Sequence, residues 1–543
     1  MTTDASPPGV NTTKDGSAPA ADSQKLDAAV LKIAGVVVIG SIMAILDITV
    51  VGVAQNTFQS LWKISPASAA WTMTAYTLAL AAVIPVTGWA ADRFGTKRLY
   101  LTSIALFVGG SVLCATAWDI VPLVAFRAIQ GLGGGMLMPL GMTILTRAAG
   151  PERIGRVMAV LGIPMLLGPI GGPILGGWLI DAVSWHWIFL INLPIGVIGF
   201  VYAFMALPKD KPSPSESFDR LGFVLLSPGL AAFLYGISSI PGEGRIGSAK
   251  VLLPALIGLV LIVAFVRHAL KKKNALIDLH LFQNRDLTFA ILTLVIFSIA
   301  FFGAMLLFPQ YFIGIRGETP LKAGLLGAPM GIGAMLTMPI AGALTDKYGP
   351  GKFVMTGLVL ILLGLVPMTM LESDTSYWVT SGAFLVMGLG MGMTMMPTMT
   401  AALKTLTAHQ VARGSTMTNI TQQVAASIGT AVISVLLTNF LTKDNGGIGG
   451  VAFSLNPVLS HPATANPEMF AAVQGQLGQI AQSAGTTPEQ FMTLGLNDAA
   501  DSFTKTILIA LIMVAFTLIP AHFLPRKPAA KSDTAAPAAA MMH

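Results

Sequence analysis

Long apolar runs separated by short polar turns fill most of the chain. A helix needs about 20 apolar residues to cross the roughly 30 Å hydrocarbon core of a bilayer, and fourteen runs reach that length. The pattern therefore predicts an all-α polytopic membrane protein. We place its fourteen transmembrane helices at 31–54, 69–91, 99–117, 120–146, 157–180, 187–207, 221–240, 251–269, 287–313, 321–344, 353–371, 376–402, 413–441 and 503–524.

Composition leads to the same class. Of the 543 residues, 54% are hydrophobic and 10% are charged, and the mean hydropathy is +0.74, whereas soluble proteins carry about 25% charged residues. A chain this apolar cannot cover itself with polar groups, which excludes a soluble globular protein. Cys114 is the only cysteine, so disulfides within the chain and cysteine-based metal clusters are excluded as well.

The cations are distributed unevenly between the turns. An even number of spans places both termini on one side of the membrane. If that side is the cytoplasm, the inside segments hold 24 of the 32 Lys and Arg residues and the outside segments hold 6. This bias is a positive-inside signal. The net charge of +7 therefore reflects topology and requires no nucleic-acid partner.

One charged turn occurs twice. Residues 88–98 read GWAADRFGTKR and residues 342–352 read GALTDKYGPGK, and the two aspartates are 254 residues apart. A Gly-rich run at 131–136 recurs at 388–393, with an offset of 257. Paired halves are common in secondary transporters, so we predict an internal duplication. The turn residues that we expect to act in gating are Gly88, Asp92, Arg93, Gly95, Lys97, Arg98, Gly342, Asp346, Lys347 and Gly349.

Asp92 is the most informative residue of these turns. Its carboxylate can accept hydrogen bonds from the N-terminus of a neighbouring helix, while Gly88 and Gly95 permit close approach and a sharp turn. We interpret the turn as a latch that forms and breaks at the cytoplasmic end. The basic residues around it also satisfy the positive-inside rule, which is the simpler explanation for their presence.

Two charged residues lie inside predicted spans of the first half. Asp47 is in the middle of the first span, and Arg127 is in the fourth. A carboxylate in hydrocarbon is costly and indicates function by default. Burial raises a carboxyl pKa and a nearby cation lowers it, so we predict that the pair couples proton movement to transport. The alternative is a structural ion pair. In the second half, Phe384 occupies the position that repeats Arg127.

Several motifs, in order along residues 30–525, carry a family resemblance. They comprise the first repeated turn, a helix 1 motif, a helix 4 motif, a glycine- and proline-rich helix 5 motif and a helix 6 motif. Together they resemble the fourteen-span drug:proton antiporters of the major facilitator superfamily (EmrB/QacA type). Beyond the turn, the residues concerned are Leu46, Asp47, Thr49, Val50, Arg127, Gln130, Gly131, Gly133, Gly168, Pro169, Gly172, Pro173, Gly176, Gly177, Trp185, Trp187, Phe189, Asn192, Pro194 and Gly196.

The resemblance implies the major facilitator fold, a central cavity and an alternating-access cycle. With the duplication, it predicts two six-helix bundles and two inserted helices, the seventh and eighth. We divide the chain into a disordered cytoplasmic tail at 1–30, a first bundle at 31–207, an inserted segment at 208–286, a second bundle at 287–525 and a tail at 526–543. The second bundle includes an outside loop at 442–502.

Helix 5 resembles the antiporter motif of the family at Gly168, Pro169, Gly172, Pro173 and Gly176. Glycines four residues apart on one face let another helix approach closely. We predict a tight, bending contact between the two halves that also blocks proton leak. Ordinary close packing is the alternative.

Methionine and aromatic side chains suit a site that accepts varied apolar compounds. For the substrate cavity we name Trp71, Tyr76, Phe301, Phe302, Met305, Phe308, Met391, Met393, Met395 and Met396. Any one of them can instead face lipid or a neighbouring helix.

We interpret the chain as a proton-coupled antiporter that exports hydrophobic or amphipathic compounds, a multidrug efflux protein of the bacterial cytoplasmic (inner) membrane with both termini in the cytoplasm. Its partners would be the bilayer, protons and a small-molecule substrate. The chain has no P-loop motif and no metal-ligand spacing, so we predict no enzyme activity, cofactor or metal. Export of an endogenous lipid, siderophore or metabolite, and a membrane sensor that does not transport, remain alternatives.

Overall fold

The computed structural model describes residues 27–150, 153–210, 217–240, 247–272, 274–407, 410–461 and 467–526. Most of the predicted tails falls outside these ranges, as do several side chains in the middle of the fifth predicted span, including those of Pro169 and Pro173. Every described element of secondary structure is a helix, and the predicted all-α class is confirmed.

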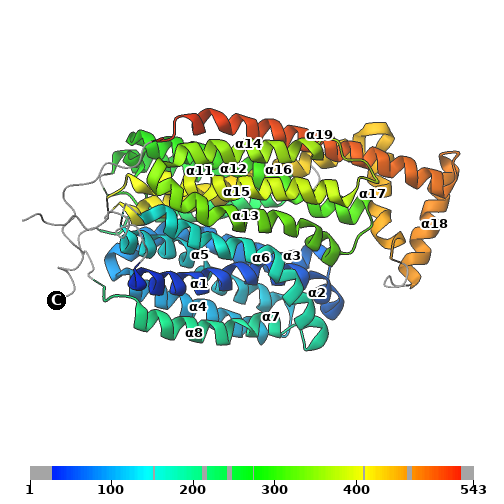
Figure 1. Ribbon diagram of the computed structural model, residues 1–543. Helices are drawn as coiled ribbons and strands as arrows, with labels where there is room; N and C mark the ends of the chain where they lie inside the picture. Colours follow the sequence, from blue (N-terminus) through cyan, green and yellow to red (C-terminus); the bar gives the residue numbers. More distant parts are fainter. Residues whose placement is uncertain are drawn as a thin grey trace, which may run out of the picture.

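The first half of the protein, residues 28–206, is a group of long helices that runs from blue to cyan-green in the lower part of Figure 1. The seventh helix is a single turn that leads into the eighth. The helices are α1 (Ala28–Val53), α2 (Gln55–Trp62), α3 (Pro66–Phe94), α4 (Thr96–Ala115), α5 (Ile120–Ala149), α6 (Ile154–Ala182), α7 (Trp187–Leu190) and α8 (Asn192–Ala206).

The two helices that the sequence predicts to be inserted, which we call the inserted pair, and then the second half, residues 285–522, follow in the upper part of Figure 1. The inserted pair is α9 (Arg220–Ser238) and α11 (Ala249–Lys271). A short helix η2 (Leu279–Gln283) leads into the second half, which consists of α12 (Arg285–Gln310), η3 (Tyr311–Ile315), α13 (Pro320–Tyr348), α14 (Pro350–Met368), α15 (Tyr377–Lys404), α16 (Val411–Lys443), η4 (Asp444–Gly447), α17 (Ile448–Leu459), α18 (Pro467–Ser483) and α19 (Pro488–His522).

Thirteen helices among the described residues are long and apolar enough to cross a membrane. They correspond to thirteen of the predicted spans. The remaining predicted span, 157–180, lies in α6, a helix of 29 residues that packs along α1 and α13. The helices therefore follow the spans that the hydrophobic pattern predicts.

The two halves repeat the same backbone contacts. A Cβ atom on Gly131 of α5 would meet the carbonyl oxygen of Tyr76 on α3, and a Cβ on Gly388 of α15 would meet that of Met330 on α13. The offsets within these pairs are 257 and 254 residues, as in the repeated motifs. The sequence repeat thus corresponds to a repeat in packing, with α3 and α5 equivalent to α13 and α15.

The repeated turns have the geometry that their glycines allow. Gly95 ends α3 with φ of 93° and Gly349 ends α13 with φ of 83°. Residues with a Cβ rarely adopt this region. Both turns reverse the chain directly into the next helix, so α3–α4 and α13–α14 are matched hairpins.

The halves meet along two lines of contact. On one, α6 packs against α13 and α15; on the other, α16 packs against α3 and α5. We call the line between α3 and α16 the α3/α16 seam. Helix α9 lies against both α3 and α16. The inserted pair therefore covers this seam from outside.

Asp219 holds the inserted pair together at its N-cap position on α9. Its carboxylate accepts hydrogen bonds from His268 Nε2 and Lys272 Nζ, both at 2.9 Å, and from the Gly222 amide at 3.0 Å. Burial opposes ionisation of the carboxyl, but the hydrogen bonds from Lys272, Gly222 and His268 outweigh it and lower the pKa of Asp219 to about 2. The contact joins the start of α9 to the end of α11.

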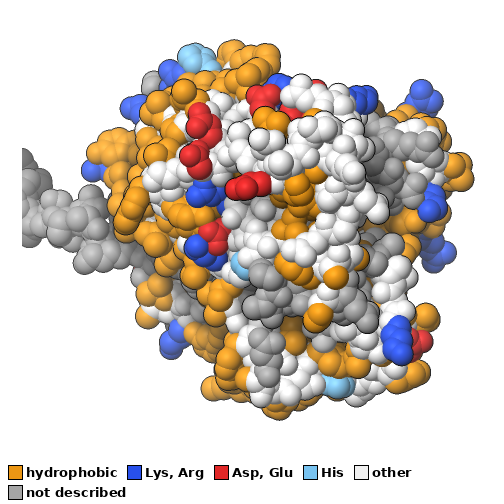
Figure 2. All heavy atoms as spheres, turned by 90° about the vertical axis from the view of Figure 1, so that its right-hand side faces the viewer, with side chains coloured by type: hydrophobic (Ala, Val, Ile, Leu, Met, Phe, Trp, Pro, Cys, Tyr) orange, Lys and Arg blue, Asp and Glu red, His pale blue; other side chains and the backbone are white. Residues whose placement is uncertain are grey.

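The predicted outside loop at 442–502 is largely helical where it is described. Helix α17 packs on α19, and α18 projects from this end of the molecule (Figure 1). The last spanning helix begins at Pro488, not at 503. Its first turns are too polar to be recognised as part of a span, but Phe491 and Ala499 are buried there. Several Asp and Glu side chains are visible on the end of the molecule shown in Figure 2.

Both repeated turns lie at the end of the molecule opposite α18 (Figure 1). A reagent that reaches only one side of the membrane should therefore label either α18 or the turns, but not both. We expect that, in a Cys114→Ala background, an impermeant thiol reagent applied to intact cells labels Gln476→Cys on α18. Thr96→Cys and Lys352→Cys should react only after permeabilisation, because we expect their end to be cytoplasmic. Labelling of either turn in intact cells would contradict the topology.

Candidate functional site

A buried ion pair lies inside the first half. Arg127 Nη1 on α5 donates to Asp47 Oδ2 on α1, and neither residue is more than 1% exposed. The structure therefore brings together the two intramembrane charges that the sequence singles out. Because an unpaired charge is costly in hydrocarbon, each of the two stabilises the buried position of the other.

Uncharged polar side chains complete the environment of the carboxylate. Gln130 Nε2 and Asn192 Nδ2 donate to Asp47 Oδ1 at 2.7 Å and 3.1 Å. Both amides also lie within hydrogen-bond distance of Ser111 Oγ, at 2.6 Å and 3.2 Å. Side chains of α5 and α8 thus surround the carboxylate of α1, and Ser111 of α4 joins the two amides.

Arg127 has its own set of partners. Its Nε donates to the carbonyl oxygen of Thr72 at 3.0 Å, and its Nη1 donates to Gln130 Oε1 at 2.7 Å. The guanidinium carbon lies 4.2 Å from the ring centroid of Tyr76 and 5.9 Å from that of Phe189. Cation–π contacts of this kind are stronger when they are desolvated. We call Asp47, Arg127, Gln130, Asn192 and Ser111 the charge network.

Sequence reasoning did not assign three members of the network. Gln130 and Asn192 stood in family motifs without a stated role, and Ser111 was not singled out. A signal was present, since each is a polar side chain within an apolar run. The sequence could not show that all three turn toward Asp47, because helix rotation is decided by packing.

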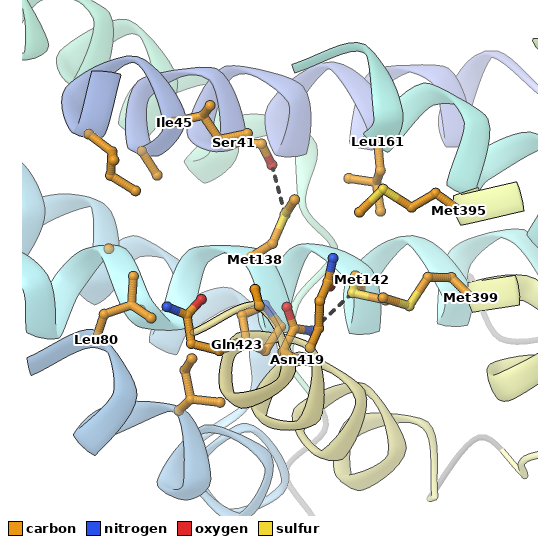
Figure 3. Close-up of a pocket in the computed structure, with 18 of the residues that line it drawn as sticks. Ser41, Ile45, Leu80, Met138, Met142, Leu161, Met395, Met399, Asn419 and Gln423 are labelled. Atoms are coloured by element: carbon orange, nitrogen blue, oxygen red, sulfur yellow. Dashed lines mark hydrogen bonds between the residues drawn. The ribbon is translucent and has the colours of Figure 1, made fainter. Parts of the chain in front are cut away.

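A central cavity of about 280 Å³ lies between the halves. Figure 3 shows side chains of α1, α5, α15 and α16 arranged around it. Asn419 Nδ2 on α16 contacts Met142 Sδ on α5 at 3.1 Å and so bridges the halves. No charged residue lines the cavity among the described ones, which include Ser41, Ile45, Ile48, Tyr76, Leu80, Met138, Met142, Met158, Leu161, Phe302, Met395, Met396, Met399, Asn419, Gln422 and Gln423.

Tyr76 connects the charge network to the central cavity. Its ring contacts the Arg127 guanidinium, and the residue also lines the cavity. The Tyr76 hydroxyl is buried and has no hydrogen-bond partner in the described structure. A ligand in the cavity would therefore contact a residue that directly touches the ion pair.

Seven of the ten predicted cavity residues line a cavity. Tyr76 and Met396 line the central cavity, while a second cavity of about 200 Å³ in the second half is lined by Met305, Phe308 and Met391. Phe302 and Met395 line both cavities.

The other three predicted cavity residues line neither of these two cavities. Trp71 is 41% exposed and stacks on Tyr235 of α9, and Phe301 stacks on Phe297 inside the second half. Met393 lines neither cavity. Trp71 and Phe301 lie on predicted helices but contact other partners, which hydrophobicity alone cannot predict.

The helix 5 glycines contact a different partner from the one expected. A Cβ on Gly168 would meet Ile45, and one on Gly172 would meet Thr49, both on α1. The stripe therefore packs α6 against α1, within the first half. The close contact between halves involves Gly155 of α6 instead, whose Cβ would meet the carbonyl oxygen of Gly342 on α13.

The two repeated turns make different contacts. Asp346 accepts hydrogen bonds from the backbone amides of Gly155 and Arg156, at 2.9 Å and 3.2 Å, and so caps α6 across the two halves. Asp92 instead pairs with Arg147 at 2.9 Å, within its own half. We expected Asp92 to accept hydrogen bonds from a helix N-terminus. In the structure, Asp346 makes this contact, with the N-terminus of α6.

The basic residues of the first turn have a separate function in packing. Lys97 Nζ donates to the carbonyl oxygens of Phe204 and Leu207, at 2.6 Å and 2.7 Å. The backbone amides of Lys97 and Arg98 donate to Asp210, both at 2.9 Å. These contacts join the start of α4 to the end of α8.

Paired halves and a buried charge inside a span are typical of secondary membrane transporters. The sequence profile of the Major Facilitator Superfamily matches residues 37–430. The chain belongs to the major facilitator superfamily.

Its relatives include bacterial drug-resistance proteins. The chain is 47% identical to a protein named multidrug resistance protein B homolog from Mycobacterium tuberculosis, over 93% of this chain and 92% of that one. It is 30% identical to a putative multidrug resistance protein MdtD from Yersinia pestis, over 75% of this chain and 87% of that one.

Solved structures support the same fold. The human organic anion transporter MFSD10 aligns with a TM-score of 0.57 at 13% identity, covering 90% of this chain and 100% of that one. The proton:xylose symporter XylE aligns with a TM-score of 0.51 at 12% identity, covering 90% of this chain and 96% of that one. At such identities, the similarity concerns the fold alone.

A double-substitution cycle can test the burial of the ion pair. Arg127→Met should lower the free energy of unfolding by roughly 3–5 kcal/mol, because it leaves the Asp47 carboxylate buried and unpaired. Adding Asp47→Asn should recover most of the loss, since an amide needs no counter-ion. Thermal unfolding in detergent measures both. Equal stability of the single and double variants would contradict the paired geometry.

Proposed function

We propose that this protein is a proton-coupled antiporter that exports hydrophobic or amphipathic compounds across the bacterial cytoplasmic membrane by alternating access, and that both termini are cytoplasmic. The observation that carries the proposal is the contact of one residue, Tyr76, with both the ion pair and the central cavity. A proton site and a substrate site must communicate in an antiporter, and this contact provides a direct route.

The coupling step follows from the charge network. In the paired state, Asp47 is a carboxylate with a full set of donors. When a proton binds Asp47, the carboxylate loses its charge and Arg127 loses its counter-ion. The Arg127 guanidinium then has to find new partners, and the Tyr76 ring beneath it moves with it. Substrate and proton would in this way occupy the protein alternately.

The substrate class follows from the lining of the central cavity. Its walls are mostly Met, Leu and Ile side chains, with the polar groups of Ser41, Asn419, Gln422 and Gln423. Methionine adapts to ligands of different shape. The amides and hydroxyl can bind polar groups without selecting a charge. The names of the relatives, multidrug resistance proteins, agree with this class.

The contacts between halves provide the switching element. Asp346 caps α6 across the halves, and Gly155 and Gly342 let α6 and α13 approach closely there. These contacts close one end of the molecule, the end that we assign to the cytoplasm. Opening that end would break the two hydrogen bonds of Asp346 and separate Gly155 from Gly342, which is compatible with rocking of the halves.

Asp47→Asn should abolish dye efflux driven by a pH gradient in proteoliposomes, because the substitution removes the titratable group at nearly constant volume. The protein should still equilibrate dye down its concentration gradient. Asp501→Asn is the matched control, since Asp501 is an exposed acid paired with Lys505, and it should transport normally. Full uphill transport by Asp47→Asn would rule out the coupling role.

Asp346→Ala should slow transport while leaving dye binding almost unchanged. The loss of a helix-cap acceptor costs about 1 kcal/mol. At Asp346 this loss weakens the contact between the halves and leaves the cavity unchanged. Asp92→Ala is the comparison, because its ion pair lies within one half, and its effect on the rate should be smaller. A larger effect at Asp92 would contradict the assignment of the latch to Asp346.

A further inference from the structure

The second half contains a cavity that the coupling mechanism does not use. It measures about 200 Å³ and lies among α12, α13 and α15. We call it the C-half cavity. Its described walls carry no charged side chain; they are formed mainly by aromatic and methionine residues, with three glycines of α13.

The C-half cavity lies at the place in the second half that corresponds, by the internal repeat, to the charge network of the first half. Phe384 on α15 occupies the place of Arg127, and Met330 on α13 occupies the place of Tyr76. Both Phe384 and Met330 line the C-half cavity. Where the first half is filled with an ion pair and its donors, the second half is therefore hollow and apolar.

The aromatic walls have the geometry of a ring-binding site. Phe308 and Phe384 lie edge to face, with centroids 4.8 Å apart and an interplanar angle of 75°. Phe312 lies 6.1 Å from Phe384 at 62°. Edge-to-face pairs present both ring edges and ring faces, so a third ring can pack against them in the same geometry. Met391 adds a polarisable sulfur beside them.

Glycines keep the cavity open on the side of α13. A Cβ atom on Gly324 or Gly327 would meet no atom within 4 Å. Gly324 is exposed, whereas Gly327 is half-buried, so a Cβ atom on Gly327 would lie in the empty space of the cavity. The absence of side chains there therefore maintains a volume that packing within the protein does not require.

The C-half cavity adjoins the central cavity, because Phe302 and Met395 line both. Drug-sized ligands occupy sites of roughly 300–1,000 Å³, and each of these two cavities is smaller than that. A single compound can thus place one group in each.

We propose that the C-half cavity binds an uncharged aromatic ring group of the exported compound, while the rest of the compound occupies the central cavity. We infer an aromatic ring from the edge-to-face pair of Phe308 and Phe384. We infer that the ring group is uncharged because the described walls carry no charged side chain. The proposal rests on the proposed function only in identifying the bound compound as the exported one; binding itself requires no proton gradient.

Equilibrium binding of Nile red, an uncharged fused-ring dye, to the purified protein in lipid nanodiscs tests the proposal. Gly327→Leu should weaken binding about ten-fold, because it fills the cavity and removes the apolar contact that the ring would make. Gly382→Leu is the matched control: a Cβ at Gly382 also meets no atom within 4 Å, and the residue lines neither cavity. Binding should be unchanged in this control.

A second variant separates ring recognition from general apolar binding. Phe384→Leu keeps the wall apolar but removes the ring partner, so Nile red should bind about three- to ten-fold more weakly. Dodecanol, an unlabelled alkyl chain without a ring, is the competitor, and it should displace the dye equally well from both proteins. If competition by dodecanol weakens as much as dye binding does, the site recognises acyl or alkyl chains, and the ring proposal is overturned.

Unchanged Nile red binding in Gly327→Leu, or equal losses in Gly327→Leu and Gly382→Leu, would also overturn the proposal. Neither result depends on coupling, because no gradient is imposed. Conversely, failure of pH-driven efflux with intact Nile red binding would refute antiport and leave the ring site in place. The two proposals can therefore fail separately.

Discussion

The cost of a charge in hydrocarbon is the constraint on which the first half depends. Asp47 and Arg127 are both fully enclosed, so every donor and acceptor around them has to come from the protein. Helices α1, α4, α5 and α8 supply the polar side chains, and α3 supplies the carbonyl oxygen of Thr72. The network therefore fixes the rotation of four helices at once.

The contact between halves obeys a different rule. There, close approach comes from glycines, and the polar contacts are few and can be exchanged. Gly155 and Gly342 bring two backbones together, and Asp346 satisfies amide groups that any helix N-terminus leaves without partners. Such an interface can separate without leaving a buried charge unpaired. Helix α9 of the inserted pair lies against both α3 and α16 and so covers the α3/α16 seam.

Duplication has preserved the backbone packing and changed the chemistry. The contacts of Gly131 with Tyr76 and of Gly388 with Met330 are equivalent, yet one surrounds a charge network and the other borders a hollow apolar space. Close helix contacts restrict which positions can carry a side chain, whereas the positions between them are free to diverge. This divergence leaves a charge network in one half and an apolar cavity at the corresponding place in the other.

The sequence by itself determined the helical class, the spans, the repeat and the identity of the two buried charges, because each of these depends on a local property: apolar length, motif spacing, or a charge where water is absent. Only the tertiary structure decided where those residues point. It showed that Gln130, Asn192 and Ser111 surround Asp47, that the glycines of α6 face α1, and that Asp346 rather than Asp92 caps a helix of the other half. It also showed that Trp71 and Phe301 stack on Tyr235 and Phe297 and line neither described cavity. In a helix that is apolar all round, the hydrophobic pattern carries no rotational information, so the facing of each side chain is settled only when the helices pack.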